Sequence, residues 1–330
     1  MTDHANLAQR ELDTGHAAGA IAAAEAGAAK DEVASLALLA GWQLAGYPVA
    51  RDLVAARGLL GRAAMVGDEW ATLAQIALTA NGSGGAADWA SALGLLRDAA
   101  ARFEEAAYHL SLIEAMDLAA DGLPRNKPVP ESIGDSPRVW LHRGFLGPDE
   151  CAHIAGSAQD LLEPSSVFDP ASGRHVAHPI RTSSAATIGP TRESLPIRAI
   201  LNRIAALAGQ PTDHGEPLSV LHYAPGQQYR MHMDTLTDTA IRHGPGAANQ
   251  RVATVLLFLN DAYEGGETVF EASGLAVRGG PGDALVFANT LANGAPDPHS
   301  RHAGAPVRAG AKWLATRWIR ARPYDVWNGG

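Results

Sequence analysis

Apolar residues in the first third of the chain follow short alanine- and leucine-rich patterns that recur at a regular spacing. The recurring segments are Ala34-x-Leu36-Ala37, Ala71-x-Leu73-Ala74 and Ala107-x-x-Leu110, about 36–37 residues apart. Small residues at such a spacing allow paired helices to pack closely, as in an α-solenoid. Residues 1–122 are therefore expected to form a short helical solenoid. An alanine-rich helical bundle without repeats is the alternative.

The distribution of proline divides the chain into parts. Of the 20 prolines, only Pro48 lies in residues 1–122, whereas four lie within residues 123–138. Proline breaks helices and stiffens linkers. This distribution predicts a helical repeat-like domain over residues 1–122, a proline-rich linker over 123–138 and a second domain over 139–330.

Beyond the linker, the hydrophobic pattern changes to short runs typical of strands. Arg138–His142 reads as a strand, and two helical stretches follow at 148–162 and 192–207. Further strand-like runs cover Leu218–Tyr223, Val252–Leu259, Ala284–Phe287 and Trp313–Ile319. Two helices followed by many short strands favour an antiparallel barrel or jelly roll with supporting helices. The whole chain is thus expected to be multidomain, α followed by α+β.

Composition and charge exclude several classes of protein. The formal net charge of −9 argues against a nucleic-acid partner bound by broad basic surfaces. A single cysteine, Cys151, excludes a disulfide framework and a cysteine-rich zinc site. The N-terminus lacks a signal-peptide pattern, and no apolar run approaches about 18 residues. These features predict a soluble, cytoplasmic protein without a membrane partner.

A histidine and an aspartate form the first candidate metal site. On a strand, His232 and Asp234 project from the same face because side chains alternate. About one such triplet is expected by chance, so the pair alone is a weak signal. Two histidines and one carboxylate form the facial triad of non-haem iron oxygenases. The third ligand must come from elsewhere, and His302 is a candidate, with His299 as the alternative.

Lys312 is one of only three lysines in a chain that otherwise uses arginine. Lysine carries a compact charge suited to a carboxylate at the bottom of a pocket. It lies ten residues after His302, but an intervening turn makes that spacing a weak geometric argument. Without a further motif, a surface lysine near the start of a strand is the favoured interpretation.

The stretch from Leu141 to Arg322 resembles the prolyl 4-hydroxylase family of Fe(II)- and 2-oxoglutarate-dependent dioxygenases. The resemblance rests on motifs that occur in the family's order. These include Phe145-Leu-x-x-x-Glu150-Cys151, Ile180-Arg181-Thr182-Ser183, Tyr223-x-Pro225-Gly226-Gln227-x-Tyr229-x-x-His232-x-Asp234, Arg251-x-x-Thr254, Gly265-Gly266-Glu267-Thr268 and His302-Ala-Gly304-x-Pro306-Val307-x-x-Gly310-x-Lys312-Trp313. More weakly, residues 20–118 resemble tetratricopeptide-like repeats.

The resemblance implies a double-stranded β-helix, or jelly roll, and a role for each matching residue. His232, Asp234 and His302 match the iron ligands, which favours His302 over His299. Three residues match those that bind the distal carboxylate of 2-oxoglutarate: Lys312, Tyr223 and Thr268. Three more match positions on the substrate side: Arg251, Tyr229 and Trp318. For these last residues the alternatives are a surface ion-pair partner for Arg251 and a core aromatic for Trp318.

The implied activity is hydroxylation of a prolyl residue in a peptide or protein, with Fe(II) as cofactor and 2-oxoglutarate and O2 as cosubstrates, giving succinate and CO2. Ascorbate, which aids relatives, is a further candidate. The same chemistry on a free amino acid or other small molecule is the alternative, followed by a non-catalytic helical scaffold with an inactive barrel. The N-terminal helices are expected to dock a proline-containing protein substrate, and the loops Phe168–Pro179 and Thr235–Gln250 match regions that cover the site in the family.

Overall fold

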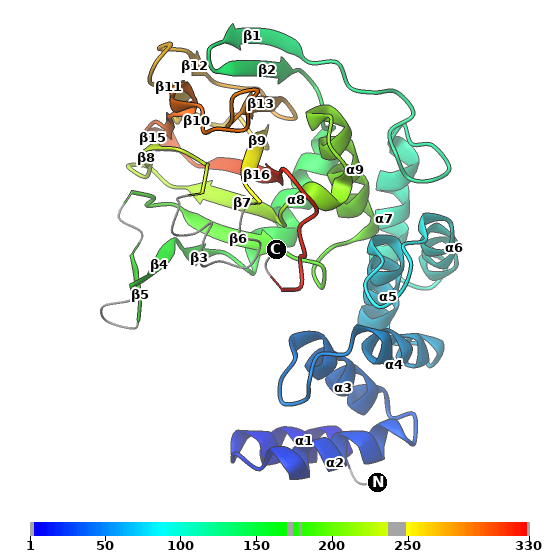
Figure 1. Cartoon of the computed structure of the whole chain (residues 1–330). Coiled ribbons are helices and arrows are strands. Elements are labelled where there is room, and N and C mark those ends of the chain that lie inside the picture. Colours follow the sequence, from blue (N-terminus) through cyan, green and yellow to red (C-terminus); the bar gives the residue numbers. More distant parts are fainter. Residues whose placement is uncertain (1–2, 170–173, 178–179, 237–248, 329–330) are drawn as a thin grey trace. The chain divides into compact units, whose positions relative to one another are not determined.

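A computed structural model describes residues 3–169, 174–177, 180–236 and 249–328 (Figure 1). The chain divides into two compact units. The first comprises Met1–Leu123 together with Pro190–Ala199, and the second comprises Pro124–Gly189 and Ile200–Gly330.

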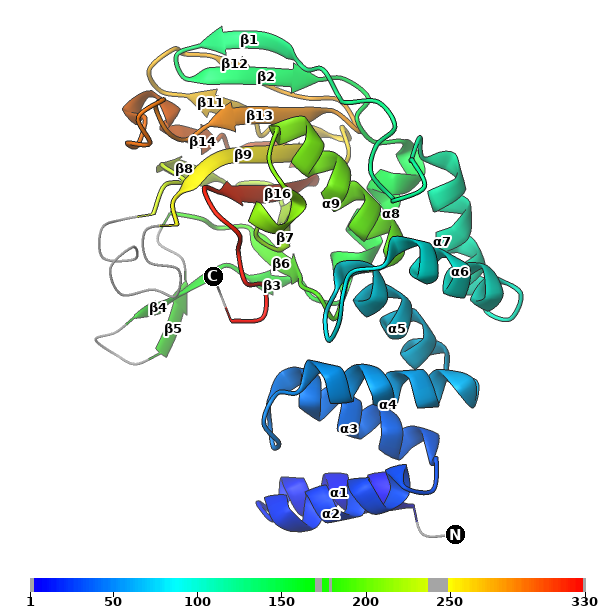
Figure 2. The ribbon, with the colours of Figure 1, turned by 45° about the vertical axis from the view of Figure 1, so that its right-hand side comes forward.

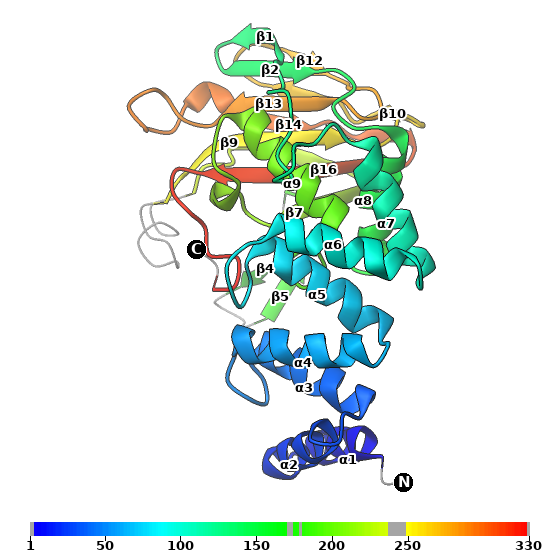
Figure 3. The same ribbon diagram turned by 90° about the vertical axis from the view of Figure 1, so that its right-hand side faces the viewer.

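The first unit contains the helices that follow one another along the N-terminal part of the chain (Figures 2 and 3). They are α1 (His4–Asp13), α2 (Ala17–Ala28), α3 (Val33–Ala45), α4 (Leu53–Met65), α5 (Glu69–Asn81), α6 (Trp89–Ala100) and α7 (Glu104–Ala115). Residues of α5, α6 and α7 share a buried apolar cluster that also includes Leu195 and Ala199, which belong to the same unit.

The helix ends of this unit recur with the spacing of the sequence pattern. Gly46 ends α3 and Gly82 ends α5, both in the left-handed region, with φ of 79° and 80°. Asp52 caps α4 and Asp88 caps α6, each accepting a backbone N–H three residues further on. Glycine tolerates the left-handed conformation and aspartate satisfies an unpaired helix N–H. These caps recur 36 residues apart, which is close to the spacing of the alanine- and leucine-rich pattern.

The second unit contains α8, most of α9 and the strands. The helices are α8 (Pro148–Gln159) and α9 (Leu195–Ala208), whose first residues count with the first unit. The strands are β1 (Glu131–Asp135), β2 (Arg138–His142), β3 (Glu163–Pro164), β4 (Ser166–Asp169), β5 (Arg174–Ala177), β6 (Ser184–Ile188), β7 (Leu218–Tyr223), β8 (Tyr229–His232), β9 (Arg251–Phe258), β10 (Tyr263–Gly265), β11 (Thr268–Phe270), β12 (Ala276–Val277), β13 (Ala284–Ala288), β14 (His302–Gly304), β15 (Val307–Gly310) and β16 (Lys312–Arg320). Short 3₁₀ turns lie at Thr212–His214 and Pro298–Ser300.

The strands pair in antiparallel fashion into one large sheet and smaller ones. The large sheet has the order β1-β2-β13-β9-β16-β7-β6-β3, and a four-stranded sheet has the order β12-β11-β14-β8. The pairs β10-β15 and β4-β5 complete the pairing in the described part of the chain. These antiparallel sheets, with α8 against β6 and β7, are consistent with a jelly-roll oxygenase domain.

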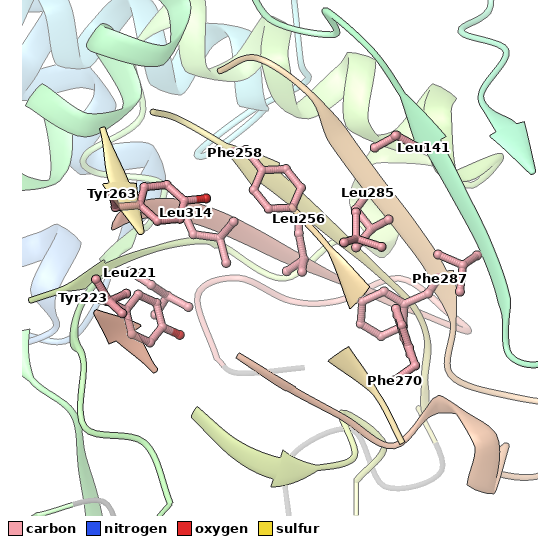
Figure 4. Packing of buried hydrophobic residues seen from close by; sticks show 13 residues of the cluster. Leu141, Leu221, Tyr223, Leu256, Phe258, Tyr263, Phe270, Leu285, Phe287 and Leu314 are labelled. Carbon is pink, nitrogen blue, oxygen red and sulfur yellow. The ribbon is translucent and has the colours of Figure 1, made fainter. Parts of the chain in front are cut away.

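An apolar core lies between the large and the four-stranded sheets (Figure 4). Phe258 and Phe287 come from the large sheet, and Phe270 comes from the smaller one, and all three are fully buried. The rings of Phe270 and Phe287 meet edge to face with centroids 5.2 Å apart. This contact fixes the two sheets against each other next to the residues described below.

The proline-rich segment differs from the expected linker. It contains β1, which pairs with β2 at the edge of the large sheet, so this part belongs to the sheet.

In the described residues, no helix combines the length and the apolar character needed to cross a membrane.

Candidate metal centre and cosubstrate pocket

Strands β8 and β14 bring two histidines and an aspartate together. His232 and His302 are direct partners in the antiparallel register of these strands. Asp234 lies two residues beyond His232, and its carboxylate oxygens are 3.6 Å from His232 Nε2 and 3.8 Å from His302 Nε2. All three side chains are buried, and one ligand atom from each lies within 4.8 Å of the others. The sequence-predicted triad is therefore assembled, whereas His299 lies apart, hydrogen-bonded to Ser136.

Backbone carbonyl groups set the orientation of both imidazole rings. His232 Nδ1 lies 2.8 Å from the carbonyl oxygen of Arg230, and His302 Nδ1 lies 2.9 Å from that of Ser300. A carbonyl only accepts, so each Nδ1 carries the hydrogen and each Nε2 keeps its lone pair. Both lone pairs are thus available on the side of Asp234.

Burial and charge favour the protonation states that a metal needs. Burial lowers the pKa of His302 to about 4, so its ring is neutral near pH 7. Burial alone would raise the pKa of Asp234, but its neighbours His232, His302 and Thr254 hold it well below the usual range. Two imidazoles that present Nε2 and one ionised carboxylate form the donor set of a facial Fe(II) site, so these residues fit the ion.

A pocket extends from this centre to Lys312. The alternating residues Lys312, Leu314, Thr316 and Trp318 of β16 all line it. They span roughly 20 Å along the strand, at about 3.3 Å per residue. The hydroxyl of Thr316 and the indole N–H of Trp318 are buried without a hydrogen-bond partner among the described residues. Two unpaired donors in a pocket indicate a polar ligand, because buried polar groups are normally paired.

Lys312 is 2% exposed, and its Nζ donates to the carbonyl oxygen of Gly266 over 2.7 Å. Burial lowers the pKa of Lys312 to about 8, and the nearby charge of Glu267 offsets part of that effect. Tyr223 is its register partner on β7, and Thr268 lies on β11; both are buried and line the pocket. The three residues predicted to bind a carboxylate therefore line the same pocket.

The three residues predicted on the substrate side have different surroundings. Tyr229 stacks on His232 with ring centroids 3.5 Å apart, and both Tyr229 and Trp318 line the pocket. Arg251 lies over the ring of Trp318 at 4.0 Å and donates two hydrogen bonds to the carboxylate of Glu216, at 2.5 and 2.8 Å. Arg251 therefore forms an ion pair with Glu216 and lies against Trp318. Its assignment to the substrate side stays a prediction.

Sequence reasoning missed Glu216, Thr254 and Asn289. Glu216 anchors Arg251, and Thr254 donates to Asp234 over 2.6 Å. Thr254 appears in the Arg251-x-x-Thr254 motif, which could have drawn attention to it. Most of the two loops expected to cover the site, Phe168–Pro179 and Thr235–Gln250, lies outside the described residues.

Comparisons with known proteins find a matching family model and similar relatives. Residues 218–320 match the model of the 2OG-Fe(II) oxygenase superfamily. Prolyl 4-hydroxylase 1 of Arabidopsis thaliana is 36% identical over 223 residues, covering 63% of this chain and 77% of the relative. Probable prolyl 4-hydroxylase 10 of the same plant is 36% identical over 221 residues, covering 61% and 75%. A solved viral collagen prolyl hydroxylase from Paramecium Bursaria Chlorella virus-1 has 26% identity and a TM-score of 0.44, covering 58% of this chain and 99% of that one.

The fold, the site and the superfamily match define a 2-oxoglutarate-dependent dioxygenase, which uses Fe(II), 2-oxoglutarate and O2. Within that class, the chain belongs to the prolyl 4-hydroxylase family.

Proposed function

We propose that this enzyme hydroxylates a prolyl residue of a peptide or protein, with Fe(II) held by His232, Asp234 and His302. The observation that carries the proposal is the buried triad at one part of a pocket that also holds Lys312. Bound there, Fe(II) together with 2-oxoglutarate and O2 supplies the oxidation of a C–H bond to C–OH, with succinate and CO2 as the other products.

Lys312, Tyr223 and Thr268 bind the distal carboxylate of 2-oxoglutarate in this proposal. One ammonium and two hydroxyl groups satisfy a carboxylate that leaves water, which would otherwise be costly. Leu221, Leu256 and Leu314 also line the pocket. In this proposal they exclude water and so strengthen the interaction of the Lys312 ammonium with the distal carboxylate.

Tyr229 and Trp318 contact the substrate in this proposal. An aromatic face suits the apolar ring of proline, and the unpaired indole N–H of Trp318 suits a peptide carbonyl group. Arg251, the third residue assigned to the substrate side, also fixes Trp318, because it lies over the indole ring and is held by Glu216. A peptide or protein substrate is supported by the relatives, which are prolyl 4-hydroxylases by name.

The finer organisation also belongs to this proposal. We interpret the two facing sheets as a double-stranded β-helix and helices α1–α7 as a short repeat solenoid that docks the protein substrate. Repeat helices commonly present an extended binding surface, and a second attachment point raises the effective concentration of a substrate. The cytoplasmic location and the use of ascorbate stay predictions, which cell fractionation and assays with and without ascorbate would check.

Succinate release in the presence of proline-containing peptides, compared with free proline, tests the proposed substrate. We expect succinate and a +16 mass shift on a prolyl residue with the peptides. Turnover with free proline alone would favour the small-molecule alternative, and no turnover of 2-oxoglutarate with Fe(II) present would favour the inactive scaffold.

A further inference from the structure

Two consecutive hydrogen bonds connect Asn289 through Thr254 to the carboxylate of Asp234. Asn289 Nδ2 lies 2.9 Å from Thr254 Oγ1, which lies 2.6 Å from Asp234 Oδ2. Thr254 and Asn289 are fully buried, and Asp234 is 5% exposed. The three residues come from different parts of the sheets: β9, the end of β13 and the segment after β8.

The chemistry of the three groups allows only one arrangement of hydrogens. An ionised carboxylate accepts only, so the single hydroxyl hydrogen of Thr254 points to Asp234. The hydroxyl oxygen must then accept from Asn289, which requires the NH2 end of that amide to face it. The amide and the hydroxyl are therefore locked, and together they fix the rotation of the carboxylate.

Asp234 needs such support because its backbone lies beyond the strand that holds His232. Strand β8 ends at His232, whereas Thr254 and Asn289 are tied to the large sheet. Thr254 pairs with Phe287 on one side and with Trp318 on the other, and the N–H of Asn289 donates to the carbonyl of Val252. The large sheet thus positions the carboxylate opposite two histidines that belong to the smaller sheet.

We propose that Thr254 and Asn289 are positioning residues that hold the Asp234 carboxylate in the orientation that binds the metal ion. The inference rests on the proposed role of Asp234 as a ligand. In this proposal the large sheet preorganises the metal site, so the affinity for the metal also depends on residues that do not touch it. Outer partners of metal ligands typically contribute 10- to 100-fold in affinity.

Titration of the metal-free full-length protein with Co(II), an ion whose visible spectrum reports its ligand geometry, tests this proposal. Thr254→Val keeps the branched shape but removes the donor, and we expect its Co(II) dissociation constant to rise about 10- to 100-fold. Thr254→Ser keeps the hydroxyl and should restore most of the affinity. Asn289→Asp presents a second acceptor to the one hydroxyl hydrogen and should weaken Co(II) binding and alter the spectrum.

Two controls separate this proposal from the assignment of the triad and from a loss of stability. Thr72→Val removes a buried hydroxyl in α5 and should leave Co(II) binding unchanged. Asp234→Ala should abolish tight binding. If it does not, the triad assignment and the proposal both fail. If Asp234→Ala abolishes binding while Thr254→Val binds Co(II) like the wild type, only the positioning role is overturned. Equal weakening in Thr254→Val and Thr254→Ser would also overturn it, because the hydroxyl would then be irrelevant.

Discussion

His232 and His302 are direct partners across the β8·β14 pair, with ring centroids 4.3 Å apart, although they lie far apart in the chain. Two residues that lie directly opposite each other on antiparallel strands place their side chains on the same face of the sheet. A shift of one residue in either strand would turn one imidazole away. The register of a short strand pair therefore decides whether the two histidines can bind one ion.

Replacing any member of this triad should abolish iron-dependent turnover. His232→Ala, Asp234→Ala and His302→Ala each remove one donor from a site that offers three. We expect no succinate formation above background and a folded protein by circular dichroism. Turnover near that of the wild type in any one variant would remove that residue from the set of ligands.

Lys312→Ala should raise the 2-oxoglutarate concentration needed for turnover by at least an order of magnitude. A hydrogen bond to a charged group contributes about 1.5–3 kcal/mol, or roughly 10- to 150-fold in affinity. Lys312→Arg should rescue poorly because the planar guanidinium is larger and the lysine stem already packs closely at Gly266. Binding of 2-oxoglutarate by the Fe(II)-loaded protein measures the effect. Equal affinity in Lys312→Ala and the wild type would contradict the assignment.

Binding of 2-oxoglutarate should weaken as the pH rises above about 8, because burial gives Lys312 a pKa of about 8 in the ligand-free protein. Below this pH the ammonium is charged and ready for a carboxylate; above it, binding must first protonate the amine. The bound carboxylate raises the pKa, so binding takes up a proton, and affinity falls by up to about tenfold per pH unit.

Calorimetric titrations in two buffers of different ionisation enthalpy measure that proton uptake directly. Lys312→Ala serves as the control, since its affinity should be low and nearly independent of pH in this range. Proton uptake that persists unchanged in Lys312→Ala would assign the effect to another group.

The sequence predicted those strands well whose burial produces a clear run of apolar residues. The runs Arg138–His142 and Leu218–Tyr223 coincide with β2 and β7, because interior strands need apolar residues at most positions. Most of the site residues followed from the resemblance of the motifs to those of the prolyl 4-hydroxylase family. Lys312 carried a further signal: its rarity in an arginine-rich chain suggested a specific role, and the structure places it at the start of β16 with 2% exposure.

The missed features depend on partners that no local pattern reveals. Strand β1 has a mostly exposed or half-exposed pattern among prolines, and only its pairing with β2 makes it a strand. Glu216 lies 35 residues from Arg251, and Asn289 lies 35 residues from Thr254. An isolated glutamate or asparagine gives no signal in the sequence, since its role arises when separate strands meet.

The last prediction concerns the boundary between the helical unit and the catalytic part. Leu195 is 1% exposed within the apolar cluster of the helical unit, so a chain that begins at Pro124 loses the residues that bury it. Exposing a leucine costs about 1.5–3 kcal/mol, and we expect this shortened chain to aggregate. Adding Leu195→Ser should restore solubility and leave 2-oxoglutarate binding as in the full chain.

If the helices dock the substrate, this soluble variant should hydroxylate short proline peptides normally but a full-length protein target slowly, because the second attachment point is lost. The full chain carrying Leu195→Ser is the matched control and should retain activity on both. Equal rates of the shortened and full chains on the protein target would show that the helices serve stability rather than docking.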